Sequence, residues 1–210
     1  MAGALKEKEF ATLACRADVL QSTDRPSDPR HVFCCTRGMN DAFLHARMLL
    51  TVQPLTQQAF APYGTVLAAP ANAGRSINGG NAERFDLVGD LQLGSAGGRA
   101  MLALFRAQAR RFPHEVTEME RHALGSQTFV PLGKRRFVIV VAQAGDAPSA
   151  DTLAAFITDG LQGITLAPGT WHHALLAVDA GDFVVIERAA GAVDCELCAL
   201  SASAVVDWKG

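Results

Sequence analysis

The sequence predicts a mainly β protein, built as an antiparallel barrel or sandwich. Strand-like runs of about four to seven residues follow one another from Met48 onward, and glycines and prolines separate them. No segment repeats with a period of about 20 to 50 residues, which excludes solenoids and propellers. With 49% hydrophobic and 19% charged residues, the 210-residue chain has the composition of a globular protein with one main core.

The first 47 residues differ in character from the rest of the chain. In Met1–Arg47, charges of both signs alternate with serine, proline and cysteine, and no apolar period persists. We expect residues 1–47 to be a weakly ordered or extraneous extension. The functional unit is then residues 48–210.

Strands make up most of residues 48–210. The first is expected at Leu49–Val52, where a run of strand-forming residues begins. The others are expected at Met101–Arg106, Thr128–Leu132, Arg136–Ala142, Ile164–Ala167, His172–Val178, Phe183–Glu187 and Glu196–Leu200.

Two helices are expected at the periphery of these strands. A short helix is predicted within Thr56–Tyr63, with Thr56 as its N-cap and Gly64 as its stop. A longer one is predicted over Ala150–Thr158, with Ser149 as its N-cap.

Charge and cysteine content narrow the classes of function. A formal net charge of -2 gives no reason to expect nucleic acid or an acidic membrane surface, so a small-molecule partner is favoured. No apolar run reaches the roughly 18 residues of a membrane span. Five cysteines are an odd number, which disfavours a disulfide framework and favours a reducing, cytoplasmic compartment. Cys195 and Cys198 are expected to be structural.

The densest polar run lies between His114 and Gly133. If it is extended, Glu118, Glu120 and His122 share one face, because side chains alternate with period 2. If it is helical, a carboxylate and His122 still meet at i, i+4. Such a pair can bind a metal or move protons, although a solvated charged loop would have the same composition.

A second candidate segment, 168–173, is a Pro-Gly turn that feeds a hydrophobic strand. His172 and His173 are adjacent, so only one of them can face inward, and the sequence does not say which. A lone histidine on a strand is more often a core or rim residue than a ligand. Barrels, however, commonly build one interior site from side chains on separate strands.

The two segments together resemble the cupin arrangement, in which two motifs supply metal ligands inside a double-stranded β-helix. Alignment on Gly133 and Gly169 places Glu120, His122, Gln127 and His172 at the ligand positions. Glu and Gln replace two of the three ligands of the first motif. This resemblance implies a mainly β, cupin-like double-stranded β-helix barrel with a few peripheral helices.

A closer resemblance, from Met48 onward, is to the ureidoglycolate lyase family of allantoin catabolism. It is carried by an ordered series of motifs: Leu55-Thr56, Phe60-Ala61-Pro62-Tyr63-Gly64, Ile77-Asn78-Gly79, Glu83-Arg84-Phe85, Glu120-Arg121-His122, Leu124-Gly125-Ser126-Gln127, Phe129-Val130-Pro131, Ala155-Phe156-Ile157, Gln162-Gly163 and Trp171-His172-His173. The resemblance implies a homodimeric lyase that cleaves (S)-ureidoglycolate to glyoxylate and urea, with a cupin-like catalytic domain over residues 48–210. It also implies a divalent metal such as nickel or manganese. The chain departs from the family where Leu166-Ala167-Pro168 replaces a common Tyr-His-Arg and Ala123 replaces a proline.

These expectations assign roles to seven residues. Glu120, His122 and His172 are the expected catalytic residues; with Gln127 they would hold a metal, and without one a histidine would be the base and Glu120 its partner or the acid. Substrate binding is expected from Arg84, Asn78, Gln127 and Trp171. Arg84 would grip the substrate carboxylate, unless it only pairs with Glu83 or Asp86, and Trp171 either stacks at the site or packs the rim.

Two other functions remain open at this point. A metal-dependent amidohydrolase would use the same pocket and release ammonia from a ureide. A non-catalytic cupin that binds a small ligand would share the fold without the chemistry.

Overall fold

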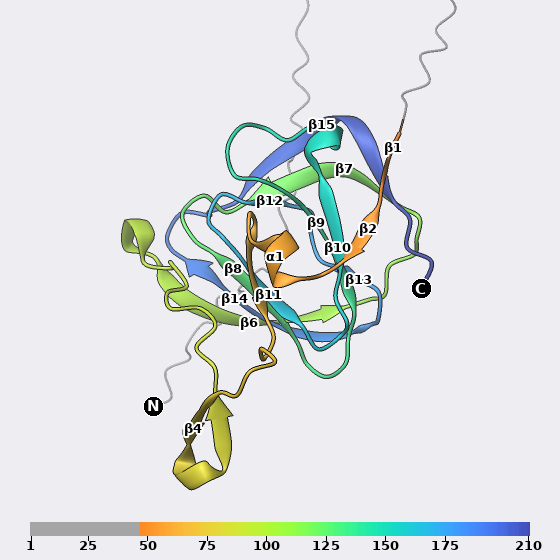
Figure 1. Ribbon diagram of the computed structural model, residues 1–210. Coiled ribbons are helices and arrows are strands. Elements are labelled where there is room, and N and C mark those ends of the chain that lie inside the picture. Colours follow the sequence, from red (N-terminus) through yellow and green to blue (C-terminus); the bar gives the residue numbers. More distant parts are fainter. Residues whose placement is uncertain (1–46) are drawn as a thin grey trace, which may run out of the picture. The chain divides into compact units, whose positions relative to one another are not determined.

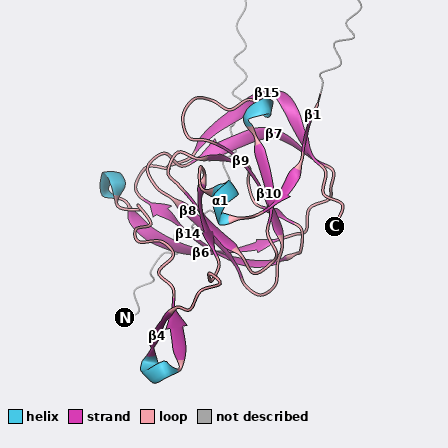
Figure 2. Ribbon diagram, in the orientation of Figure 1, coloured by secondary structure: helices cyan, strands magenta, loops and turns pink. Residues whose placement is uncertain are grey.

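The computed structural model describes residues 47–210, which form strands joined by turns and a few short helices (Figures 1 and 2). The predicted mainly β, barrel-like fold is confirmed. No helix in this part of the chain is long and apolar enough to cross a membrane. The extension predicted for residues 1–47 lies almost wholly outside the described residues and stays a prediction.

The larger sheet curls until its two edges meet in one segment of chain. Its strands are, in order, β1 (Met48–Leu50), β15 (Glu196–Val206), β7 (His114–Arg121), β12 (Trp171–His172), β9 (Phe137–Ala142), β10 (Ala154–Ile157) and β2 (Val52–Pro54), and β13 (Leu176–Ala177) pairs with β9. The edge strands β1 and β2 are separated only by Thr51, and they pair in parallel with β15 and β10. The sheet therefore closes on itself.

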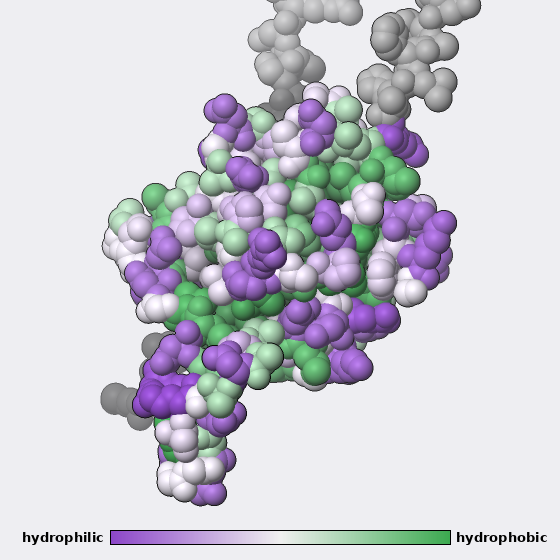
Figure 3. All heavy atoms as spheres, viewed as in Figure 1, coloured by the Kyte–Doolittle hydropathy of each residue, from purple (hydrophilic) through white to green (hydrophobic). Residues whose placement is uncertain are grey.

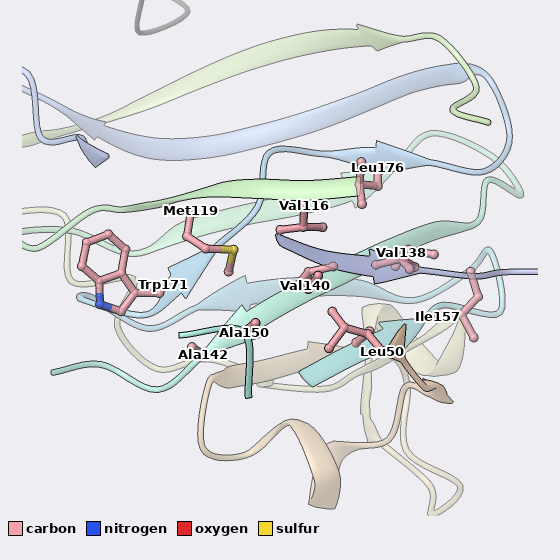
Figure 4. Packing of buried hydrophobic residues seen from close by; sticks show 13 residues of the cluster. Leu50, Val116, Met119, Val138, Val140, Ala142, Ala150, Ile157, Trp171 and Leu176 are labelled. Carbon is pink, nitrogen blue, oxygen red and sulfur yellow. The ribbon is translucent and has the colours of Figure 1, made fainter. Parts of the chain in front are cut away.

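The inside of this curled sheet is the first hydrophobic core. Most of it is filled by side chains that alternate along the strands, as Val138, Val140 and Ala142 do on β9. Figure 4 shows the packing of these residues, among them Met119, Val116, Val138, Val140, Leu50, Trp171 and Leu176.

The second sheet covers the other face of β9 and β10. Its order is β3 (Gly64–Leu67), β11 (Gly163–Leu166), β8 (Gln127–Pro131), β14 (Gly181–Ala189) and β6 (Arg99–Ala107), with all neighbours antiparallel. A second core joins the two sheets, with edge-to-face aromatic pairs between Phe60 and Phe156 and between Phe137 and Phe183. Two sheets that face each other across a core are the arrangement expected of a cupin-like barrel.

Short elements complete the fold. The helix α1 (Gln57–Phe60) begins as predicted, because the Thr56 hydroxyl accepts a hydrogen bond from the amide of Ala59. The turns η1 (Asn78–Gly80) and η2 (Ser95–Gly97) are 3-10 helices. A hairpin of β4 (Arg75–Ile77) and β5 (Ala82–Arg84) forms a separate two-stranded sheet (Figure 1).

The prediction of a longer helix over Ala150–Thr158 is wrong. Ser149 does cap a helical turn, but that turn, η3 (Ala150–Thr152), is a 3-10 helix that ends after three residues, and the chain continues as β10. Ser149 therefore predicted the start of a helical turn correctly, but not how long the helix would be. Tertiary contacts make the second half of the segment a strand, because Phe156 and Ile157 pair with β9 and fill the two cores.

The strand predicted over His172–Val178 is two strands. His172 pairs with Val141, whereas Leu176 pairs with Val138, so the register shifts by one residue between β12 and β13. The extra residue interrupts the ladder in the manner of a β-bulge.

Candidate active site

Three predicted residues meet at one end of the interior between the sheets. Glu120 lies near the end of β7, and its cross-strand partner in β12 is His172. His122 follows directly after β7, where its carbonyl accepts a hydrogen bond from the amide of Gly169. That bond ties the Pro-Gly turn to the end of β7 and brings both histidine-bearing segments together.

The three side chains form one cluster of possible ligand atoms. One atom from each of Glu120, His122 and His172 lies within 4.8 Å of the others. The Nε2 atom of His172 is 3.4 Å from Oε1 of Glu120, and the two imidazole rings are 5.3 Å apart, centroid to centroid. His172 is buried, and about a quarter of the Glu120 side chain is exposed, so the cluster opens outward at the carboxylate.

Hydrogen bonds to the backbone fix the tautomers of both imidazoles. Nδ1 of His172 lies 3.0 Å from the carbonyl oxygen of Thr170, and Nδ1 of His122 contacts the carbonyl of Asp194. A carbonyl can only accept, so each neutral ring carries its hydrogen on Nδ1. The Nε2 lone pairs then point into the cluster, and both Nε2 atoms are buried without a hydrogen-bond partner in the described structure.

The Glu120 carboxylate remains ionised in this setting. Burial by itself would raise its pKa, but the close contact with His172 and the positive charge that the neighbouring histidines carry when protonated outweigh burial and bring the pKa below its ordinary value. The cluster thus presents a carboxylate and two imidazole lone pairs to the same point. Such a donor set calls for a proton or a divalent cation at its centre.

Gln127 faces the same interior from the second sheet. Its side chain is buried, and Nε2 donates to the carboxylate of Glu187 over 2.9 Å, while Oε1 is buried without a hydrogen-bond partner in the part of the chain described. Glu187 was not predicted as a site residue, although period 2 along β14 places it on the inward face with Phe183 and Val185.

Asp194 and Cys195 are two further residues that sequence reasoning missed. The carboxylate of Asp194 accepts hydrogen bonds from the amides of Ala123 and Leu124, which fixes the loop that follows His122. The sulfur of Cys195 lies 3.8 Å from Oε2 of Glu120. Neither contact has a sequence signal, since each depends on the pairing of β15 with β7.

His173 lies apart from the cluster. Its ring packs edge to face on His114 at 5.3 Å, and its Nδ1 contacts the carbonyl of Ala174. Burial lowers the pKa of His173, and the charges of His114 and Arg110 lower it further. The structure therefore brings His172, and not His173, to Glu120.

The cavity beside His172 is too small for a substrate. A cavity of about 10 Å³ lies against His172, and Phe129, Ile139 and Leu166 line it. That volume holds about one water molecule at most. Leu166, which replaces the tyrosine common in the family that the sequence resembles, is buried here. A substrate must therefore meet the cluster at its open side.

Trp171 is on the opposite side of the strand from His172. Its ring fills the first core, its indole N–H donates to the carbonyl of Asp146 over 3.0 Å, and the guanidinium of Arg121 stacks on it at 4.4 Å. Of the two roles considered for Trp171, the packing role fits this placement.

Trp171→Phe is therefore expected to cost stability and leave turnover intact. Loss of buried volume and of the indole hydrogen bond should lower the free energy of unfolding by about 1–3 kcal/mol. Urea denaturation and steady-state kinetics would measure both effects. Trp208→Phe is the matched control, because the Trp208 indole N–H has no hydrogen-bond partner in the described residues. Native stability with lost turnover in Trp171→Phe would place the indole at the reaction instead.

Arg84 and Asn78 are on the β4–β5 hairpin, which stands clear of the barrel in Figure 1. Arg84 is exposed and pairs with Asp86 at 2.6 Å, one of the two ion pairs considered for it. Asn78 is exposed at the tip of the hairpin, where its φ is 53°.

Comparisons of the sequence with a family model and with known proteins all identify the same family. The family model described as Ureidoglycolate lyase matches residues 47–207. A ureidoglycolate lyase of Burkholderia mallei (strain NCTC 10229) is 45% identical over 140 residues, which cover 66% of this chain and 82% of that protein. One of Burkholderia cepacia is 41% identical over 163 residues (77% and 92%), and ureidoglycolate lyase 1 of Rhizobium meliloti (strain 1021) is 44% identical over 142 residues (67% and 82%).

Proposed function

The chain belongs to the ureidoglycolate lyase family, and from this premise we propose that it cleaves (S)-ureidoglycolate to glyoxylate and urea. The observation that supports this activity is the cluster of Glu120, His122 and His172 at the open end of the barrel interior. Family membership favours the lyase over an amidohydrolase or a non-catalytic binding protein. The proposal places the catalytic domain at residues 48–210 and the enzyme, as a homodimer, in the cytoplasm.

The reaction needs one proton to move between two atoms of the substrate. Ureidoglycolate carries a hydroxyl and a ureido nitrogen on one carbon, next to a carboxylate. The hydroxyl loses its proton, the carbon–nitrogen bond breaks, the carbon–oxygen bond becomes the aldehyde of glyoxylate, and the nitrogen gains a proton to leave as urea. No water is consumed.

The cluster suits a divalent cation such as nickel or manganese. Two buried Nε2 lone pairs and an ionised carboxylate converge, and neither Nε2 has a hydrogen-bond partner among the described residues. Glu120, His122 and His172 would hold the cation, with Gln127 on the facing sheet as a fourth candidate through its unpartnered Oε1. When bound, a divalent cation lowers the pKa of a hydroxyl that coordinates it.

The remaining chemistry would be done by polar groups on the second sheet and on the β4–β5 hairpin. Gln127 holds the Glu187 carboxylate toward the interior. Glu187 is half-buried and would accept the hydroxyl proton and return it to the departing nitrogen. Arg84 and Asn78 would bind the substrate carboxylate and the ureido group, because a guanidinium grips a carboxylate with two hydrogen bonds and an amide matches a ureide.

A product assay tests the activity. Purified protein incubated with (S)-ureidoglycolate should release glyoxylate and urea in equal amounts, without ammonia. Ammonia in place of urea would show an amidohydrolase, and binding without turnover would show a ligand-binding protein.

Removal of metal is expected to abolish most of this activity. Dialysis against a chelator should lower turnover by about 100-fold or more, and nickel or manganese should restore it. Independently of turnover, added metal should raise the melting temperature of the depleted protein, because a ligand at about 100 times its Kd stabilises the native state by about 2.7 kcal/mol. His122→Gln should lose this thermal shift. Full activity at negligible metal content would contradict the proposal and make a histidine Nε2 the base.

A further inference from the structure

The β4–β5 hairpin is not supported by a core of its own. Between Val66 and Leu93, both buried, no side chain in the structure is buried. β4 and β5 pair with each other and join neither of the larger sheets. In Figures 1 and 3 the hairpin stands clear of the barrel, at the lower edge of the view. A lone two-stranded hairpin is at best marginally stable in water, so this one needs a surface to pack on.

Apart from the cation proposed at the cluster, the candidate active site has no free arginine or lysine, among the described residues, to bind the substrate carboxylate. Its described charged groups are the carboxylates of Glu120 and Glu187 and the histidines. Two nearby arginines are engaged elsewhere: Arg121 binds Glu196 and the carbonyl of Gly145, and Arg188 binds backbone carbonyls of η2. A substrate carboxylate taken out of water needs a positive partner.

The hairpin carries exposed arginines, which the site lacks. Arg75 and Arg84 are cross-strand partners and both are exposed, which makes one face of the hairpin positive. Asn78 stands at its tip with a positive φ, a conformation that asparagine tolerates better than most residues. The charges of the hairpin and of the barrel mouth are thus complementary, but within one chain Arg84 only meets Asp86 in solvent.

An apolar surface on the same chain is available for self-association. β6 is an edge strand of the second sheet, and its outward-facing Leu102 and Leu104 are 72% and 54% exposed. Opposite them on β14 are Ile186 and Val184, so the apolar side chains form a continuous outer face. An exposed apolar edge of this kind marks an interaction surface.

We propose that the β4–β5 hairpin of one copy reaches the barrel mouth of a second copy and places Arg84 and Asn78 over the Glu120–His172 pair. Each active site is then built from two chains, and the β6 face contributes to the contact between them. The inference rests on the proposed lyase function, because ureidoglycolate is the anion that Arg84 would bind.

Complementation between two inactive variants tests the inference. Chains carrying Glu120→Gln and Arg84→Ala, each with its own affinity tag, are co-expressed, and mixed dimers are purified through both tags. If the hairpin acts across the dimer, one site of each mixed dimer combines an intact Glu120 with an intact Arg84. The mixed dimer should then show about half of wild-type activity, whereas each parent variant should fall about 100-fold or more.

The alternative outcomes are separable. If the hairpin serves its own chain, neither site in the mixed dimer is intact, and activity stays at the level of the parents. A monomer in light scattering, or an Arg84→Ala variant with wild-type kcat/KM, would also overturn the inference. Ser76→Ala is the matched control, because Ser76 is exposed on the other face of the same hairpin, opposite Glu83, and this variant should retain wild-type activity. A wild-type protein that makes no urea would refute the proposed function itself, before any question about the hairpin.

Discussion

Glu120→Gln is expected to lower kcat by about 100- to 10,000-fold with little change in stability. The substitution keeps the shape of the side chain and removes its charge. It thereby takes away the only carboxylate in the three-residue cluster, whose pKa lies below its ordinary value. Substrate cleavage at saturating ureidoglycolate measures the effect, and thermal unfolding confirms that the variant folds.

Glu118→Gln is the control for this prediction. Glu118 lies two residues earlier on the same strand, is exposed, and is not part of the cluster. The control should keep wild-type kcat. If both variants were equally active, Glu120 would have no part in the reaction, and the cluster would be a structural feature of the barrel end.

Gly64→Ala is expected to destabilise the fold by about 3 kcal/mol or more. A Cβ added at Gly64 would lie 1.9 Å from the carbonyl oxygen of Thr165, well inside contact distance, and the obstacle is backbone that cannot rotate away. The pairing of β3 with β11 would have to break at its first residue pair, where Gly64 lies opposite Leu166. The urea midpoint of unfolding measures the loss.

Gly89→Ala separates this clash from the general effect of replacing glycine. A Cβ at Gly89 meets no heavy atom within 4 Å, so the control should unfold at the wild-type urea concentration. Equal midpoints for the two variants would show that β3 can shift away from β11 at little cost. The prediction of Gly64 as the helix stop does not supply another role, because α1 ends at Phe60 and Gly64 begins β3.

The strands of the barrel were the most predictable part of the structure. Runs such as Phe137–Ala142 are apolar throughout because both of their faces are buried, one in each core. The N-caps at Thr56 and Ser149 were also predictable, since capping depends on a few neighbouring residues. The conformation of the chain beyond a cap is decided by distant partners. Residues after Thr152 therefore extend along β9 although their local sequence favours a helix.

The candidate site was predictable in its composition more than in its geometry. The polar run and the Pro-Gly-x-x-His turn pointed to Glu120, His122 and His172, which the structure brings together. The choice between His172 and His173 depended on the register of β12, in which His172 lies opposite Glu120 and Val141, and the sequence does not show that register. Cys195 reaches Glu120 only through the long-range pairing of β15 with β7.

The closure of the larger sheet by β1 and β2 has a consequence for the order in which the protein folds during synthesis. β1 leaves the ribosome first among the described strands, but its partner β15 is made last, and β2 waits for β10. Until β15 emerges, the barrel is an open sheet whose edges are available to other nascent chains. Contacts of such long sequence separation form slowly, and early exposure of strand edges promotes aggregation. Slower translation of the codons for β15 should therefore lower the yield of native protein more than the same delay placed in the middle of the gene.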